Sequence, residues 1–116
     1  MTDSVTKLPN CTKAFVEEQK ITQYLLDLTH EDGKSKAKFF LSRGFSLDEW
    51  ESLVKALCQH GANNEIAKIM TTPFGQKFIV ECNISTPDNR NPCIRTIWIL
   101  EDGETSPRLS TAYPHL

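Results

Sequence analysis

The sequence lacks the features of a membrane or secreted protein. No apolar run approaches the roughly 18 residues needed to cross a bilayer, and residues 1–20 contain no apolar stretch of signal-peptide length. Both absences predict a cytoplasmic protein with no membrane partner. A secreted toxin fragment remains an alternative, because a larger carrier protein could supply the signal peptide.

The cysteines and histidines show no metal-binding spacing. Cys11, Cys58, Cys82 and Cys93 form no CxxC pair, and no combination of Cys and His matches a zinc site. We therefore expect free thiols in a reducing compartment, with neither a structural disulfide nor a bound zinc ion.

Familiar catalytic motifs are also absent. The sequence contains no glycine-rich phosphate loop and no GxSxG, and its acidic residues show no pairing typical of a two-carboxylate hydrolase or a magnesium site. If the protein is an enzyme, we expect it to work without a metal or another cofactor.

The composition suits one small domain. A chain of 116 residues, 39% of them hydrophobic and 24% charged, can bury a core of its own. The net charge of −2 argues against binding long nucleic acids by bulk electrostatics, but it leaves room for a local basic pocket. We expect a flexible N-terminal arm at residues 1–10 and a single domain at residues 11–116.

Hydrophobic periodicity predicts three helices in the first half of the chain. An apolar stripe with the spacing i, i+3, i+4, i+7 begins at Ile21. Gly44 stands where a glycine would end a second helix. Ser46 and Glu49 have the spacing of a capping box, which predicts the start of a third helix. The expected helices are about residues 17–28, 34–43 and 46–60.

The residue pattern of the second half of the chain is typical of β-strands separated by turns. Short runs rich in β-branched residues alternate with turn signals such as those at Gly75 and Gly103. The expected strands are residues 65–71, 77–83, 93–101 and 107–113. We predict an α+β fold with N-terminal helices packed on one face of a C-terminal four-stranded antiparallel β-meander. The predicted packed residues are Tyr24, Leu25, Phe40, Trp50, Leu53, Leu57 and Trp98, the last of them under the third helix.

A histidine and several lysines lie around the start of the second expected helix. His30 stands on a turn, Gly33 lets the backbone bend, and Lys34, Lys36 and Lys38 follow. The first turn of the helix also offers free N–H groups, which favours an anion there. Helical geometry puts Lys34 and Lys38 on one face and turns Lys36 away from them. The alternative interpretation is a solvated, positively charged face.

Two hydroxyl groups stand near the end of the last expected strand. Thr111 and Tyr113 are predicted to share one face with Leu109, an arrangement that can aim two donors at one ligand, although both are ordinary strand residues. Arg95 interrupts an otherwise apolar strand. It is either a gatekeeper on an edge strand or an anion contact.

The sequence resembles a bacterial domain family of unknown function over residues 8–114, nearly its whole length. The motifs that carry the resemblance are K-I-x-x-Y-L-L from Lys20, H-x-x-G-x-S-K-A-x-F-F-x-x-x-G-F from His30, T-P-F-G-x-K-F from Thr72, R-T-I-W-I from Arg95, and P-R-L-x-T-A-Y-P from Pro107. More distantly, it is similar to the barnase–EndoU–colicin–RelE-like ribonuclease superfamily, whose helices precede a four-stranded antiparallel sheet.

The distant resemblance also implies a site. Several contact-dependent toxins of that superfamily use an early histidine, a nearby basic residue and a Thr-x-Tyr on the last strand. Carried over to this sequence, the implied catalytic residues are His30, Lys36, Thr111 and Tyr113, with Arg95 and Lys34 as substrate contacts.

These observations predict a toxin-like, metal-independent endoribonuclease that cleaves RNA by attack of the 2′-hydroxyl. Its partners would be RNA and a cognate immunity or antitoxin protein. The alternative is a non-catalytic binding module of the same fold, acting in a toxin–partner or mobile-element system. The slightly acidic charge differs from the basic charge of many such ribonucleases and favours this alternative.

Overall fold

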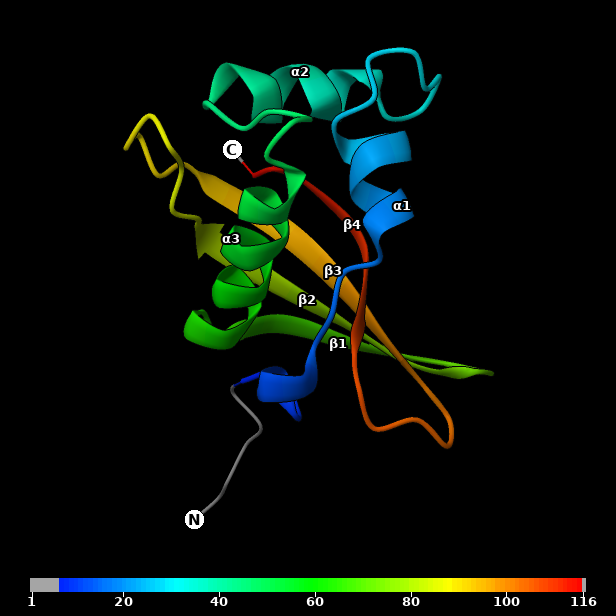
Figure 1. The fold of residues 1–116 in the computed structure, drawn as a ribbon. Coiled ribbons are helices and arrows are strands. Elements are labelled where there is room, and N and C mark those ends of the chain that lie inside the picture. The colour runs from blue at the N-terminus through cyan, green and yellow to red at the C-terminus, as the bar shows by residue number, and fades with distance from the viewer. Residues whose placement is uncertain (1–6, 116) are drawn as a thin grey trace.

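A computed structural model describes residues 7–115 of the chain. Helices form the first half of the sequence, four strands form the second half, and the helices pack on one face of the sheet (Figure 1). The predicted α+β fold is therefore confirmed. Within the described range, no helix is long and apolar enough to cross a membrane. Residues 1–6 of the predicted arm lie outside this range, whereas Leu8 is 2% exposed and belongs to the core.

The first helix is short and changes its winding. α1 (Glu18–Lys20) runs directly into a π-helical segment, η2 (Ile21–Leu25), and the N–H of Leu26 donates to the carbonyl five residues earlier at 2.8 Å. The carboxylate of Asp27 then accepts the N–H of Thr29 at 2.8 Å. This side-chain hydrogen bond favours a turn over another helical residue, so the helix ends three residues earlier than predicted.

The two later helices follow most of their sequence signals. Gly44 has a φ of +102° just after α2 (Lys34–Ser42), as a terminating glycine requires. The hydroxyl of Ser46 accepts the N–H of Glu49 at 3.3 Å, which is the first half of the predicted capping box. Regular helix nevertheless begins later than expected, and α3 spans Trp50–Asn63.

Gly61 lies inside α3 rather than at its end, because it makes room for Trp98. A Cβ atom on Gly61 would lie 2.9 Å from Cζ2 of Trp98, so only glycine lets the helix approach the indole this closely. Trp98 is 0% exposed, and its Nε1–H donates to the hydroxyl of Thr96 at 2.8 Å. The predicted burial of Trp98 under this helix is confirmed.

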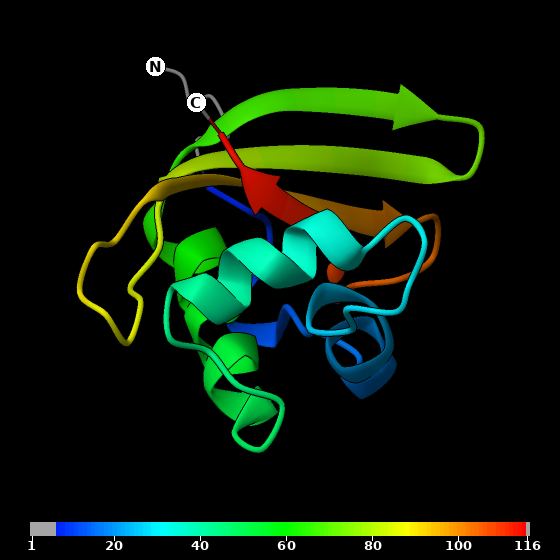
Figure 2. The same ribbon diagram turned by 90° about the horizontal axis from the view of Figure 1, so that it is seen from above.

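The sheet is an antiparallel meander in the order β1-β2-β3-β4, as predicted. The strands are β1 (Ile66–Thr72), β2 (Gly75–Asn83), β3 (Cys93–Glu101) and β4 (Arg108–Pro114). Seen from above, α2 and α3 lie on the same side of the sheet (Figure 2). The predicted core residues Leu25, Phe40, Leu53 and Leu57 are each 0% exposed. Tyr24 and Trp50 are only partly buried and pack against this core.

A bulge in β4 changes which side chains share a face. Leu109 pairs with Trp98, and Thr111 pairs with Ile97, so one extra residue of β4 lies between two neighbouring residues of β3. Leu109 therefore points into the core with Trp98, while Thr111 and Tyr113 share the opposite face. The prediction that Leu109, Thr111 and Tyr113 line one face is wrong, because an alternating pattern does not reveal a bulge.

Candidate functional site

The side chain of Tyr24 lies at the centre of a group of polar side chains from three separate segments. Its hydroxyl is 3.2 Å from the hydroxyl of Thr111 on β4. The edge of its ring meets the ring of His30, with 4.9 Å between the ring centroids. The end of the first helix, the turn before α2 and the last strand thus converge on one phenol.

Two lysines face the Tyr24 ring. Nζ of Lys36 lies 5.1 Å from the ring centroid and Nζ of Lys20 lies 5.3 Å from it. Partial burial raises the pKa of the Tyr24 hydroxyl, but its interactions with Lys36 and Thr111 and the positive charges of both lysines outweigh burial. The pKa of Tyr24 is therefore lowered from its usual value.

A turn with a defined hydrogen-bond pattern holds His30 against Tyr24. Nδ1 of His30 accepts the backbone N–H groups of Asp32 and Gly33, both at 3.0 Å. Because Nδ1 accepts, the neutral ring carries its proton on Nε2. Gly33 is buried against Tyr24, and a Cβ there would lie 2.6 Å from the carbonyl oxygen of Tyr24. The glycine therefore permits the close approach of this turn to η2.

A hollow of about 380 Å³ adjoins this group. Lys20, Tyr24 and His30 line one part of it, and the carboxylate of Glu17 and the amides of Gln19 and Gln23 line the rest. The part next to the phenol, the imidazole and the ammonium can therefore hold a polar, negatively charged group, whereas Glu17 disfavours an anion at the other part.

Arg95 and Tyr113 belong to a second group, which lies next to the first along β4. Nε of Arg95 donates to the carboxylate of Glu81 at 2.7 Å, and its guanidinium carbon lies 5.9 Å from the centroid of the Tyr113 ring. Hydrogen bonding to Tyr113 and to Glu81 raises the pKa of Arg95. Tyr113 and Thr111 are two residues apart on one strand face, which is roughly 7 Å.

The edge-strand interpretation of Arg95 is wrong. β3 lies between β2 and β4, so Arg95 is on an internal strand. It stands directly opposite Glu81 on β2, and the two side chains form a cross-strand ion pair. Strand order is set by contacts between distant segments, which an arginine in an apolar run does not reveal.

The structure thus divides the predicted site residues into two groups. His30, Lys36 and Thr111 are brought together by Tyr24, whereas Arg95 and Tyr113 contact each other. Lys34 is the exposed first residue of α2. Sequence reasoning missed Lys20 as a site residue and placed Tyr24 in the core. The available signal was the phenol itself, because a partly buried tyrosine hydroxyl usually has a polar partner.

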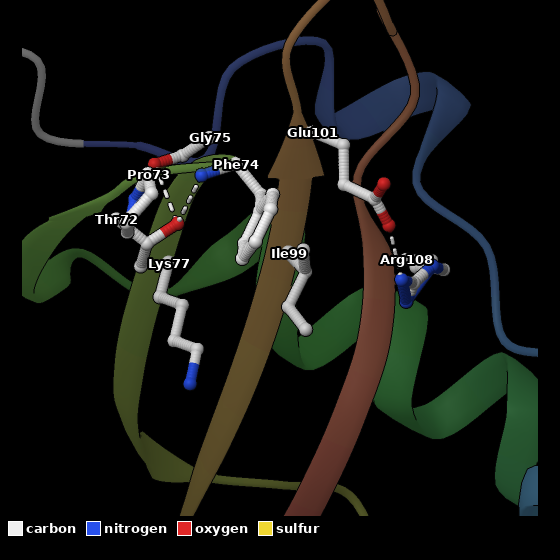
Figure 3. A pocket seen from close by; sticks show the side chains of 8 residues that line it. All are labelled: Thr72, Pro73, Phe74, Gly75, Lys77, Ile99, Glu101 and Arg108. Carbon is white, nitrogen blue, oxygen red and sulfur yellow. Dashed lines mark hydrogen bonds and ion pairs between the residues drawn. The ribbon is translucent and has the colours of Figure 1, made fainter.

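A larger hollow of about 460 Å³ lies at the turn between β1 and β2. Figure 3 shows the ring of Phe74 beside the side chain of Ile99, with Arg108 and Glu101 forming an ion pair at the other side. Since no histidine or tyrosine lines the hollow, we place the candidate site around Tyr24 instead. Among the residues that the structure describes, no group of three or more His, Cys, Asp or Glu side chains is placed to hold a metal ion.

Comparisons with known proteins give a family and a fold. A family model described as "Domain of unknown function (DUF6883)" matches residues 7–116. The comparison with curated proteins gave no match. Among solved structures, a chain of the "Contact-dependent growth inhibition toxin - immunity protein complex from Klebsiella pneumoniae 342" is similar, with a TM-score of 0.68 and 16% sequence identity. The match covers 91% of this chain and 97% of that chain, and at this identity it shows a shared fold.

Proposed function

The chain belongs to the DUF6883 family, and from this premise we propose that it is a toxin-like, metal-independent endoribonuclease with its site around Tyr24. The observation that carries the proposal is the group around the Tyr24 side chain, whose hydroxyl contacts Thr111 and whose ring faces His30 and two lysines. The shared fold with a chain from a toxin–immunity complex supports the toxin-like role. RNA in the cytoplasm would be the substrate, and an immunity or antitoxin protein would be the partner.

RNA cleavage of this kind needs few protein groups, because the 2′-hydroxyl of RNA is itself the nucleophile. Tyr24, with its lowered pKa, would accept the proton of the 2′-hydroxyl as it attacks the phosphorus. The ammonium of Lys36 would give a proton to the departing 5′-oxygen, so a 2′,3′-cyclic phosphate and a 5′-hydroxyl result. Exchange with water then returns both groups to their starting state.

The remaining groups would stabilise the phosphate during this step. The Nε2–H of His30 would donate to its oxygens, and the charge of Lys20 would offset the developing negative charge. This donor role fits His30 better than the role of general base, because its Nδ1 already accepts two backbone N–H groups. The hydroxyl of Thr111 would donate to the deprotonated oxygen of Tyr24 and so keep it ready to accept the proton. Tyr113, Arg95 and Lys34 would contact the neighbouring nucleotide.

The proposal is tested with the purified chain and labelled RNA in the presence of EDTA. We expect cleavage that leaves cyclic phosphate ends, no cleavage of DNA, and no cleavage at a position where the RNA carries a 2′-deoxyribose. His30→Ala should reduce cleavage while the circular dichroism spectrum stays unchanged. Cleavage at the deoxyribose position, or a requirement for a divalent metal, contradicts the proposal.

Exposed apolar side chains on the β1–β2 hairpin favour a second candidate function. Phe74 is 77% exposed, and Met70, which pairs with Lys77 on the face where Phe74 and Lys77 line a hollow, is 42% exposed. This surface suits a non-catalytic module that binds an immunity or antitoxin protein. The second candidate gains support if the folded chain cleaves no RNA and Phe74→Ser abolishes binding to the protein encoded by the adjacent gene.

A further inference from the structure

The thiols of Cys82 and Cys93 lie next to each other where β2 ends and β3 begins. In the register of the two strands, Cys82 is opposite Ile94 and Asn83 is opposite Cys93, so the two cysteines are diagonal neighbours. Strand spacing and rise place their Cα atoms roughly 6 Å apart, within the range that a disulfide spans. The side chain of Cys82 is also one of the groups that raise the pKa of the Cys93 thiol.

The backbone of Cys82 explains why the two thiols share a face. Regular alternation would turn Cys82 inward with its partner Ile94, which is 0% exposed. Cys82 instead has a φ of +124°, and its side chain is exposed. Nε2–H of the buried His60 donates to the carbonyl of Cys82 at 2.9 Å and holds this unusual conformation. A non-glycine residue in this region is strained, and here the strained backbone turns the side chain of Cys82 away from the core.

We propose that Cys82 and Cys93 are a redox-active pair that oxidation converts into a disulfide. The oxidant is a small disulfide such as oxidised glutathione. The thiolate of Cys82 attacks one glutathione sulfur and releases the first glutathione thiolate, and the thiolate of Cys93 then attacks the sulfur of Cys82 and releases the second. The protein loses two protons and two electrons, and the oxidant becomes two glutathione thiols.

The environment of the pair assigns the order of the two steps. Partial burial, hydrogen bonding to Cys82, and the negative charges of Cys82 and Glu81 raise the pKa of Cys93 to about 11. Because Cys82 is exposed and Cys93 is partly buried, Cys82 reacts first. Cys93 gives up its proton when it attacks the sulfur of the mixed disulfide at Cys82. Cys58, by contrast, is half-buried in α3, and burial raises the pKa of its thiol. It is the matched control within this chain.

The test is peptide mapping of the wild-type chain after incubation with oxidised glutathione. Free thiols are blocked, and the protein is digested with trypsin without reduction. Cleavage after Lys77, Arg90 and Arg95 puts the two cysteines on separate peptides, residues 78–90 and 91–95. We expect these peptides to appear linked, with a mass lower by two hydrogen atoms than their sum. Reduction should separate them.

Two variants and a melting curve complete the test. Cys58→Ser should keep the linked peptide, and Cys82→Ser should lose it. Because the bond closes the loop between the strands, oxidation should raise the melting temperature of the wild type by roughly 5–15 °C. Stable glutathione adducts on both cysteines, or a link to another cysteine or to a second chain, overturn the proposal. The wild-type map decides the question even if Cys82→Ser does not fold.

Discussion

The hydroxyl of Tyr24 lies 3.2 Å from the hydroxyl of Thr111, although 87 positions of sequence separate them. The contact joins the first helix to the last strand, so it exists only in the complete fold. His30 and Lys36 reach the same phenol from the turn before α2 and from α2 itself. The candidate site therefore depends on three segments that fold together.

The first prediction concerns the phenol. Tyr24→Phe keeps the ring that contacts His30 but removes the hydroxyl, so RNA cleavage should fall by about 10²–10³-fold, the usual loss for one group that acts on the transition state. Stability should change little, because the hydroxyl is only partly buried. The measurement is the initial rate of cleavage of a labelled RNA, with Tyr113→Phe as the comparison. An equal loss in both variants would place the chemistry between the two tyrosines rather than at Tyr24.

The second prediction concerns the charge beside the phenol. Lys36→Gln removes a group that lowers the pKa of Tyr24, so that pKa should rise. In a Tyr113→Phe background, Tyr24 is the one remaining tyrosine, and the absorbance of tyrosinate against pH reports its titration directly. Lys38→Gln, an exposed position of α2, is the control and should leave the titration unchanged. A titration that is the same in all three proteins contradicts the arrangement.

Much of the fold could be predicted because its signals are local. The helical stripe, the glycine at position 44 and the turns between strands each act over a few residues, and the structure has the corresponding elements. One boundary moved for a local reason too, because the side-chain hydrogen bond of Asp27 ends the first helix three residues early. The third helix extends past its predicted end at residue 60, because Gly61 lies inside it and makes room for Trp98.

The candidate site could be predicted only in part, because its geometry depends on distant contacts. The resemblance to ribonuclease toxins drew attention to His30, Lys36 and Thr111, and these side chains do meet at Tyr24. Tyr24 itself was assigned to the core because it lies on the apolar stripe. The bulge in β4 and the internal position of β3 arise from strand pairing, so the sequence pattern could not show the faces of Thr111 and Arg95.

The third prediction concerns the centre of the core. Trp98→Ala should destabilise the protein by about 3–5 kcal/mol, since it removes a fully buried indole and leaves a cavity under α3. Trp50→Ala is a matched control, because the second tryptophan of the chain is only partly buried and should cost less. Chemical denaturation followed by circular dichroism measures both. If Trp98→Ala lowers the free energy of unfolding by less than about 1 kcal/mol, the buried indole contributes little to the stability of the core.

A buried histidine gives the fourth prediction its basis. His60 is 2% exposed; its Nε2–H donates to the carbonyl of Cys82, and its Nδ1 lies 3.1 Å from the hydroxyl of Thr96. That hydroxyl also accepts the Nε1–H of Trp98, so it donates its own hydrogen to Nδ1. When His60 is neutral, both of its ring nitrogens, the hydroxyl of Thr96 and the Nε1–H of Trp98 each have a hydrogen-bond partner. A proton on Nδ1 would take the place of the hydrogen that Thr96 donates.

Acid should therefore destabilise the protein through His60. Burial lowers the pKa of His60 in the folded state, and the hydrogen bonds to the backbone only partly oppose it. The unfolded chain then binds the proton more readily, so the stabilisation is fully present above the unfolded pKa of about 6.5 and is lost as the pH falls below it. Denaturation midpoints at about pH 7.5 and about pH 5 measure this loss, above the range where most carboxylates titrate. His60→Gln should be less stable at the higher pH but should lose less on acidification. If the wild type and His60→Gln lose the same free energy of unfolding, His60 is not the group that responds to pH.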